Sequence, residues 1–203
     1  MPVHASSGSD TASRLLAEAR ALFLKRNYAD VTMDQVVAAA EVTKGALYHH
    51  FKGKEELYLA MLHQDLAEKQ GLFDLAADSP GSCRERLRRL TLSFLELPRE
   101  KRDLIMLVRR DVNVFDEPVR SELVRAYQAA LPAQVERILR DGMRDGELAP
   151  TDARLLSWDF VALVEVSLSP YAGSVHPRDE AKLDHVLNLF FQGASAPPGE
   201  PRT

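Results

Sequence analysis

Residues 42–51, with the sequence VTKGALYHHF, place hydroxyl, ammonium, phenol and imidazole groups within one short segment. If this segment is helical, Lys44, Gly45, Tyr48 and His49 share an outer face, and apolar side chains occupy the opposite one. A helix fits the major groove of B-form DNA, and a glycine on its outer face lets the backbone approach the base edges. The residue types therefore indicate a helix that binds DNA.

Further donors extend the same surface. Thr32 and Thr43 stand where helices are expected to begin, and hydroxyl and free backbone N–H groups at such positions bind phosphate well. Each residue also has a structural explanation: Thr43 as a helix cap, Tyr48 as a packing residue, and the histidines as solvated side chains. Together they favour DNA binding. The predicted DNA-binding residues are Thr32, Thr43, Lys44, Gly45, Ala46, Tyr48, His49 and Lys54.

Three helices are expected to hold this surface. The first runs over about 11–26, with an apolar face. The second begins at Thr32, where the sequence TMDQ has the form of a capping box, and the third covers about 43–50. Only residues 40–42 separate the second helix from the third, which is the short turn of a helix-turn-helix.

Residues 11–58 resemble the DNA-binding region of TetR-type transcriptional regulators, nearly throughout the stretch ARALFLKRNYADVTMDQVVAAAEVTKGALYHHFKGKEELY. The chain departs from the commonest form at His50, Lys52 and Gly53. The residues that match the family pattern are Phe23, Tyr28, Thr32, Val36, Ala40, Val42, Gly45, Tyr48, Phe51, Lys54 and Leu57.

This resemblance implies a homodimer that binds a double-stranded DNA operator. It also implies a larger helical C-terminal domain that binds a small-molecule effector and dimerises through its last two helices. Most members are repressors that the ligand releases from a palindromic operator, and a TetR-type activator is the alternative.

Helical periodicity continues along the rest of the chain without β-type alternation, so the expected fold class is all-α. Pro132 is expected to kink or split one long helix. The further helices are expected at 54 to about 74, 82–97, 100–113, 117–145, 152–170 and 178–191. The expected organisation is a disordered N-terminus at 1–10, a DNA-binding domain at 11–54, a ligand-binding and dimerisation domain at 55–192, and a disordered tail at 193–203.

Two segments of the C-terminal part, LLSWDFVALVEVSLSPY and LDHVLNLFFQG, are apolar on more than one face. They are either central core helices or the helices of a two-fold dimer interface, and the family resemblance favours the interface. The predicted interface residues are Val161, Val164, Leu168, Leu183, Val186, Leu187 and Phe190.

A ligand pocket is expected in the same domain. Arg109, Asp159 and above all Glu165, which lies within an apolar run, are candidate polar anchors. Ordinary core packing explains the aromatic residues, and salt bridges or solvated faces explain the charged ones. The predicted pocket residues are Phe94, Met106, Arg110, Phe115, Tyr127, Trp158 and Glu165.

Charge and composition narrow the function classes. The whole chain of 203 residues has a formal net charge of -4, but residues 1–54 carry seven Lys or Arg against five Asp or Glu. This basic start and acidic remainder are typical of a nucleic-acid-binding domain on an acidic body. We find no motif of an enzyme, so we expect no catalytic residues. A helical protein-interaction module is the remaining rival.

Location and cofactors follow from what the sequence contains. No segment approaches the roughly 20 apolar residues of a membrane span, and no signal peptide follows Met1. We therefore expect a cytoplasmic protein without a membrane partner, a cofactor or a required metal. The single cysteine, Cys83, lies in PGSCRER, which looks exposed. The nearby helix start and arginines are expected to lower its pKa, with only a faint prospect of redox sensing.

Overall fold

The structure, a computed structural model, describes residues 7–194. Within that range the regular secondary structure is helical throughout, which confirms the all-α fold class. Residues 1–6 and 195–203, which include most of the two predicted disordered segments, lie outside the described range. Ser7–Asp10 belong to the first helix and residues 193–194 to the last one.

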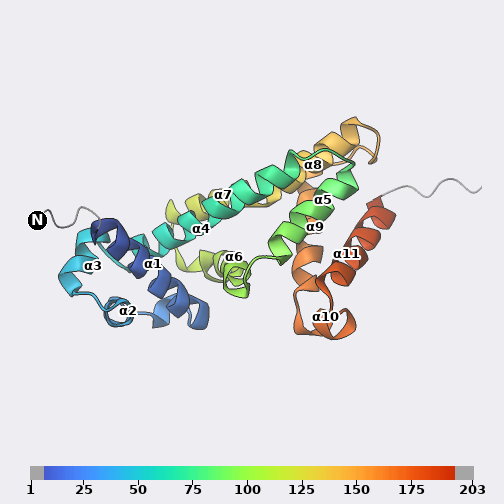
Figure 1. Cartoon of the computed structure of the whole chain (residues 1–203). Coiled ribbons are helices and arrows are strands. Elements are labelled where there is room, and N and C mark those ends of the chain that lie inside the picture. Colours follow the sequence, from blue (N-terminus) through green and yellow to red (C-terminus); the bar gives the residue numbers. More distant parts are fainter. Residues whose placement is uncertain (1–6, 195–203) are drawn as a thin grey trace, which may run out of the picture. The chain divides into compact units, whose positions relative to one another are not determined.

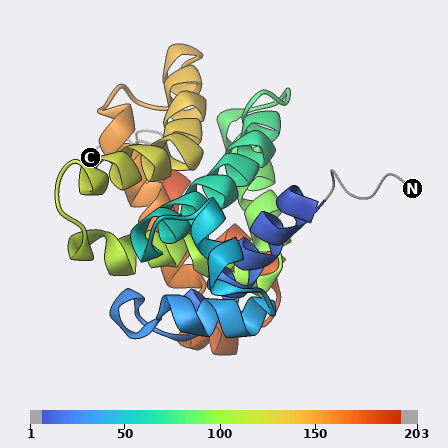
Figure 2. The ribbon, with the colours of Figure 1, turned by 90° about the vertical axis from the view of Figure 1, so that its left-hand side faces the viewer.

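The three predicted DNA-binding helices are present: α1 (Ser7–Lys25), α2 (Met33–Ala40) and α3 (Lys44–His50). They lie together at the blue end of the colour scale (Figures 1 and 2). Helix α1 packs against both α2 and α3. The side chains of Phe23, Val36 and Leu47 are almost fully buried in this small core.

The capping box that TMDQ predicts is formed at the start of α2. The Gln35 N–H donates to Thr32 Oγ1 at 3.3 Å, and the Thr32 N–H donates to Gln35 Oε1 at 3.0 Å. The helix ends at Glu41, whose φ of 52° is left-handed, and the Glu41 and Val42 N–H groups bond to carbonyls of α2. These local bonds explain why so short a turn can reverse the chain between α2 and α3.

The chain divides into two compact units, and helix α4 (Lys54–Ala77) contributes residues to both. The first unit comprises residues 7–67 and 98–127 among those described. Besides α1 to α3 it contains the 3₁₀ turn η1 (Tyr28–Asp30), α6 (Arg99–Asp111), the 3₁₀ turn η2 (Val112–Val114) and most of α7 (Val119–Ala130).

The second unit comprises residues 68–97 and 128–194. Helix α9 packs against α8 and α11, and α11 also packs against α5. The interior of this unit is mainly apolar, as expected for helices that each bury an apolar stripe, although Lys69, Thr91, Gln134, Ser157 and Ser167 are buried there as well. Its helices, besides the end of α4, are α5 (Cys83–Leu95), α8 (Pro132–Arg144), α9 (Ala153–Ser167), α10 (Pro170–Val175) and α11 (Asp179–Ala194).

Proline explains two boundaries in the C-terminal part. The helix predicted over 117–145 is split, because α7 ends at Ala130 and α8 begins at Pro132, where the missing N–H is harmless. Helix α10 was not predicted, since the segment was interpreted as a break. Its signal was Ser169, whose hydroxyl accepts the Ala172 N–H at 3.2 Å, followed by Pro170 at the first helical position.

Cys83 corrects the expectation of an exposed thiol with a lowered pKa. Its side chain is 1% exposed, and its backbone N–H donates to Glu147 Oε2 at 2.8 Å. Burial, reinforced by the negative charge of Glu147, raises the pKa of the thiol to about 12. The thiol therefore stays protonated at neutral pH, and its environment is that of a packing residue rather than a redox sensor.

Two findings concern the described residues as a group. No helix within 7–194 is both long enough and apolar enough to cross a membrane. In the same range, no three His, Cys, Asp or Glu side chains come together in an arrangement that could hold a metal ion.

Candidate nucleic-acid interface

Helix α3 has one buried and one exposed side, as its sequence predicts. Leu47 is fully buried and Phe51, just beyond the helix, is 7% exposed. On the opposite side Gly45 and His49 are exposed, and the Tyr48 side chain is 51% exposed. A phenol ring left half in water on a helix that buries its other face is available to bind a partner.

Thr32 and Thr43 act as helix caps. Thr43 Oγ1 accepts the Ala46 N–H at 3.1 Å, and Thr32 Oγ1 accepts an N–H in the capping box. In these bonds each hydroxyl is an acceptor, so its own O–H is still a donor. The caps thus place two exposed O–H donors at helix starts, where the helix dipole also favours an anion.

Lys44 forms an ion pair between α2 and α3. Its Nζ lies 2.7 Å from Asp34 Oδ1, and both side chains are about two-thirds exposed. The hydrogen bond and charge of Asp34 raise the pKa of Lys44, so its ammonium stays charged. An exposed pair of this kind stabilises the fold little, so Lys44 can exchange Asp34 for a phosphate or a base edge.

Lys54 is held within the fold. Its Nζ donates to the carbonyl oxygens of Tyr28 at 2.9 Å and Ala29 at 3.3 Å, and it lies 4.5 Å from the centre of the Tyr28 ring. The ammonium therefore caps η1 and joins it to the start of α4. A phosphate contact by Lys54 stays a prediction, and the contact that is formed was not evident from the sequence.

Arg14 is a positioning residue that sequence reasoning missed. Its guanidinium donates from α1 to the carbonyl oxygens of Ala40 and, at 3.4 Å, of Glu41. These carbonyls end α2 directly before the turn into α3. A cation at a helix C-terminus is favourable, and here it ties the turn of the helix-turn-helix to α1.

The predicted pocket residues fall in both units and do not share one function. In the first unit, Met106 is 39% exposed, whereas Phe115 and Tyr127 are buried. Phe115 packs in an aromatic cluster with Tyr28 and Tyr58, with ring centres 4.9 Å and 5.5 Å away. Packing in this cluster is enough to explain why position 115 is aromatic, and no bound ligand is needed.

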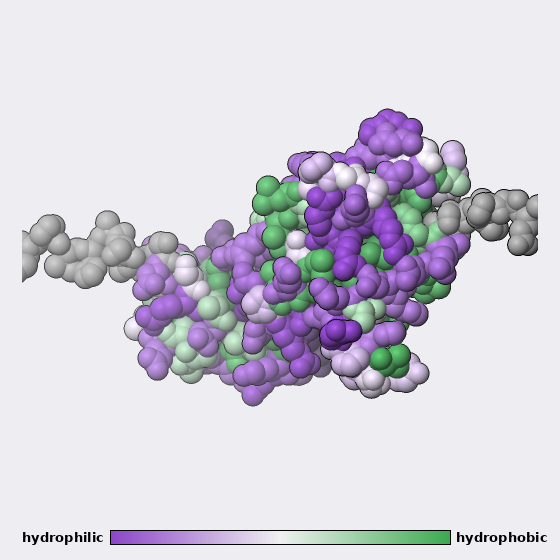
Figure 3. All heavy atoms as spheres, turned by 45° about the vertical axis from the view of Figure 1, so that its right-hand side comes forward, coloured by the Kyte–Doolittle hydropathy of each residue, from purple (hydrophilic) through white to green (hydrophobic). Residues whose placement is uncertain are grey.

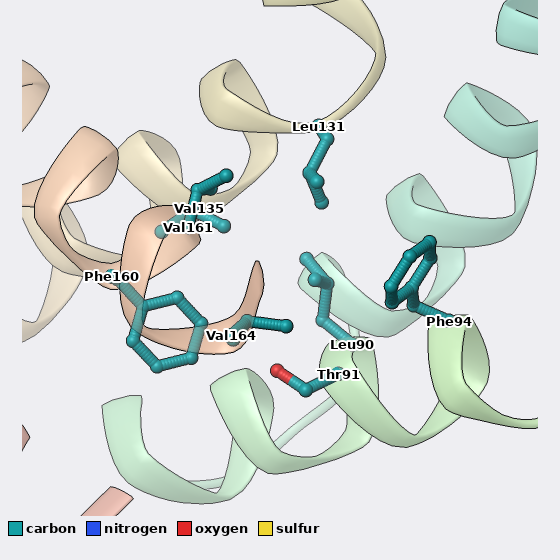
Figure 4. A pocket seen from close by; sticks show the side chains of 8 residues that line it. All are labelled: Leu90, Thr91, Phe94, Leu131, Val135, Phe160, Val161 and Val164. Carbon is teal, nitrogen blue, oxygen red and sulfur yellow. The ribbon is translucent and has the colours of Figure 1, made fainter. Parts of the chain in front are cut away.

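The second unit contains Phe94, Trp158 and Glu165. Phe94 lines an apolar cavity between α5, α8 and α9, whereas Trp158 is 36% exposed and Glu165 is partly exposed. The strongest anchor candidate, Glu165, is not among the residues that line this cavity. The lining side chains converge on one space (Figure 4): Leu90, Thr91, Phe94, Leu131, Val135, Phe160, Val161 and Val164.

Six of the seven residues predicted for the dimer interface are buried within the second unit, and Leu168 is partly exposed. The exposed side of α9 instead carries Leu155, Trp158 and Val166, which lie three, eight and eleven positions apart and so share one helix face. Leu189 on α11 is 51% exposed as well. Figure 3 shows hydrophobic residues, in green, at the surface among hydrophilic ones.

The predicted interface residues therefore lie mainly in the protomer core and not on its surface, for a simple reason. A helix that is apolar on two faces does not reveal which face enters its own core. Val161, Val164 and the buried residues of α11 fill the protomer core, so the other apolar face is the one available to a partner.

Comparison with known proteins connects both units to one family. Residues 15–61 match the family of bacterial regulatory proteins known as the tetR family, and residues 80–167 match the tetracyclin repressor-like C-terminal domain. The first match contains the whole helix-turn-helix, and the second runs from Pro80, just before α5, to Ser167, the last residue of α9. The chain belongs to the TetR family.

Membership of the TetR family makes this chain a ligand-responsive, DNA-binding transcriptional regulator and not an enzyme. It is similar along most of its length to two regulators. YhgD of Bacillus subtilis is 24% identical over 188 residues, which is 92% of this chain and 98% of YhgD. The transcriptional activator FasR of Mycolicibacterium smegmatis is 27% identical over 186 residues, or 91% of this chain and 83% of FasR.

The transcriptional repressor NemR of Escherichia coli, a third relative, is 35% identical over 79 residues, which is 38% of this chain and 40% of NemR. The crystal structure of its reduced form has a TM-score of 0.70 and 22% identity, and covers 93% of this chain and all of NemR. The likeness in structure shows that both proteins have the TetR fold.

Proposed function

We propose that this TetR-family protein is a repressor whose α3 binds the major groove of a palindromic operator. The observation that carries this proposal is the face of α3 on which Lys44, Gly45, Tyr48 and His49 are all exposed, opposite the buried Leu47. Phosphate donors at the starts of α2 and α3 border it. NemR, a relative, is named a repressor and FasR an activator, so regulation in the opposite direction is the alternative.

Selection from a pool of random duplex DNA at near-physiological salt tests DNA recognition. Enrichment of an inverted repeat would support a dimeric, sequence-specific regulator. If the folded protein enriched no sequence, a helical protein-interaction module would replace it. Placing the selected operator in front of a reporter gene then separates repression from activation by the sign of the change.

We propose a homodimer formed through the exposed apolar faces of α9 and α11. In a two-fold interface each residue is buried twice, so one substitution acts at two places. Val166→Glu should leave the protomer folded, since Val166 is 69% exposed, but it would bring two carboxylates into an apolar contact. We expect dimer dissociation to become easier by at least about 2 kcal/mol, or roughly 30-fold.

Sedimentation at a series of protein concentrations measures this effect. Val114→Glu is the matched control, because Val114 is 55% exposed in η2 of the first unit. A dimer unaffected by Val166→Glu would remove α9 from the interface, and a monomeric wild type would remove the interface altogether.

We propose that the effector enters the apolar cavity of the second unit and is uncharged. Seven of its eight lining side chains are hydrocarbon, and the Thr91 hydroxyl already donates to Leu87 O at 2.8 Å. A charged ligand would lose hydration there without gaining a partner. The open centre measures about 10 Å³, room for about one water molecule. A larger ligand must therefore displace side chains of α5, α8 and α9, which couples binding to movement.

Matched probes test the charge of the ligand. Toluene or indole, but not benzoate, should raise the melting temperature. At a ligand concentration of a hundred times the dissociation constant, the unfolding free energy should rise by about 2.7 kcal/mol. Val164→Ile, which adds one methylene at the cavity wall, should weaken the effect. Equal stabilisation by benzoate, or an effect indifferent to Val164→Ile, would place the ligand elsewhere.

A further inference from the structure

The end of α6 is bonded to the end of α1 within the first unit. Arg110 Nη2 donates to the carbonyl oxygens of Phe23 and Arg26, at 3.1 Å each. Phe23 lies in the last turn of α1 and Arg26 directly follows the helix, where helical N–H partners run out. A guanidinium there satisfies them and complements the negative end of the helix dipole.

Asp111 connects the same guanidinium to α4. Its Oδ1 accepts the Arg110 Nε–H at 2.8 Å, and its Oδ2 accepts both Arg110 Nη2 at 2.7 Å and the Tyr58 hydroxyl at 2.8 Å. Asp111 is 3% exposed and Tyr58 is fully buried. Burial, together with the bond to Asp111, raises the pKa of Tyr58, so its hydroxyl remains the donor.

These residues form what we call the carbonyl clamp: Tyr58 on α4, Asp111 and Arg110 on α6, and the carbonyls at the end of α1 to which Arg110 donates. In this ion pair the Asp111 side chain is buried and the Arg110 side chain is 35% exposed. Such a pair adds little net stability, because desolvation of the carboxylate and solvent at the guanidinium both oppose it. Hydrogen bonds with fixed directions do, however, select one arrangement of the helices that they join. The clamp is therefore suited to holding helices in register rather than to holding the unit together.

The DNA-binding helices depend on α1 for their own placement. Both α2 and α3 pack on α1, and Arg14 of α1 binds the carbonyls at the turn between them. An orientation imposed on α1 by α4 and α6 is thus passed on to α3. Separation of the clamp would leave α3 intact and loosen its orientation.

We propose that the carbonyl clamp fixes the orientation of the DNA-binding helices on α4 and α6, and thereby the half-site spacing that the dimer accepts. This inference rests on the proposed function, since spacing has meaning only for a dimer on an inverted repeat. Tyr58, Asp111 and Arg110 are positioning residues that need not touch DNA. One added base pair moves a half-site by about 3.4 Å and turns it by roughly 34°.

The test uses the full-length protein and the selected operator, with the spacer between half-sites changed by one or two base pairs in either direction. Tyr58→Phe removes only the hydroxyl and keeps the ring, and Arg110→Met removes the guanidinium while keeping a long side chain. Wild type should discriminate against altered spacers by more than about tenfold, and both variants should lose roughly fivefold or more of that discrimination. Affinity for a single half-site should stay within about twofold of wild type, because α3 is unchanged.

Two matched controls should keep the wild-type spacer profile. Tyr28→Phe deletes a hydroxyl from the same aromatic cluster but outside the clamp, and Arg99→Met deletes an exposed guanidinium at the other end of α6. An unchanged profile in folded clamp variants would overturn the proposal. So would loss of half-site binding in both variants, which indicates a purely structural role. If wild type selected no DNA sequence, the proposed function itself would fail, and that result is distinct from both.

Discussion

Leucine in place of Gly45 is expected to abolish operator binding without destabilising the protein. A Cβ atom at position 45 would meet only Thr43 Oγ1, at 3.8 Å, which is an ordinary contact. Glycine within a helix is less stable than alanine by about 0.5 to 1 kcal/mol, so the unfolding free energy should stay level or rise. In the complex, the added side chain would occupy the space that the groove needs. We expect operator affinity to fall by at least about 3 kcal/mol, or more than roughly 100-fold.

Gly71→Leu is the matched control for this experiment. Gly71 lies within α4, is exposed, and a Cβ atom there would meet nothing within 4 Å. The control should bind operator like wild type, and thermal unfolding should show both variants folded. If Gly45→Leu bound operator with wild-type affinity, the backbone of α3 would not approach the groove closely at this position.

Alanine in place of Gly142 is expected to have the largest effect on stability. A Cβ atom at Gly142 of α8 would lie 2.8 Å from Cys83 Cβ and 2.9 Å from its Sγ. These atoms stand at the start of α5, where the Cys83 N–H is also bonded to Glu147, so relief requires movement of backbone. Overpacking of this kind should lower the unfolding free energy by about 1 to 3 kcal/mol, despite the better helix propensity of alanine.

Urea unfolding of Gly142→Ala and Gly71→Ala, side by side, measures this difference. Both substitutions replace a helical glycine by the same residue, so helix propensity cancels. Gly71→Ala should raise the unfolding free energy by roughly 0.5 to 1 kcal/mol. Equal stabilisation by both variants would mean that α5 and α8 do not approach as closely at this point as the structure has them.

Local signals in the sequence predicted the helix-turn-helix well. Capping at Thr32 and Thr43, and the break before Pro132, depend on bonds between residues a few positions apart. Such bonds leave a recognisable pattern in the sequence. The position of the apolar Leu47 among the polar residues of α3 leaves one as well. The missing prediction of α10 shows the limit of this approach, since a single Ser-Pro start was its only signal.

Contacts between distant residues could not be predicted in this way. Arg110 and Lys54 look like solvated or ligand-binding cations, but each satisfies backbone carbonyls more than 20 positions away. Cys83 looked exposed, although a loop that follows α8 covers it with Glu147. Backbone carbonyls leave no mark in the sequence, so residues that act by binding them are the ones that pattern analysis misplaces.

Recognition of base edges by α3 is tested most directly by Tyr48→Ala. DNA would be selected in parallel by wild type and by Tyr48→Ala, and the preference would be compared at every position of the inverted repeat. If α3 reads base edges, Tyr48→Ala should relax the preference at one symmetry-related pair of positions, with about 1 to 3 kcal/mol less discrimination there, and leave the others intact. An identical preference at every position, or an even loss across all of them, would contradict it.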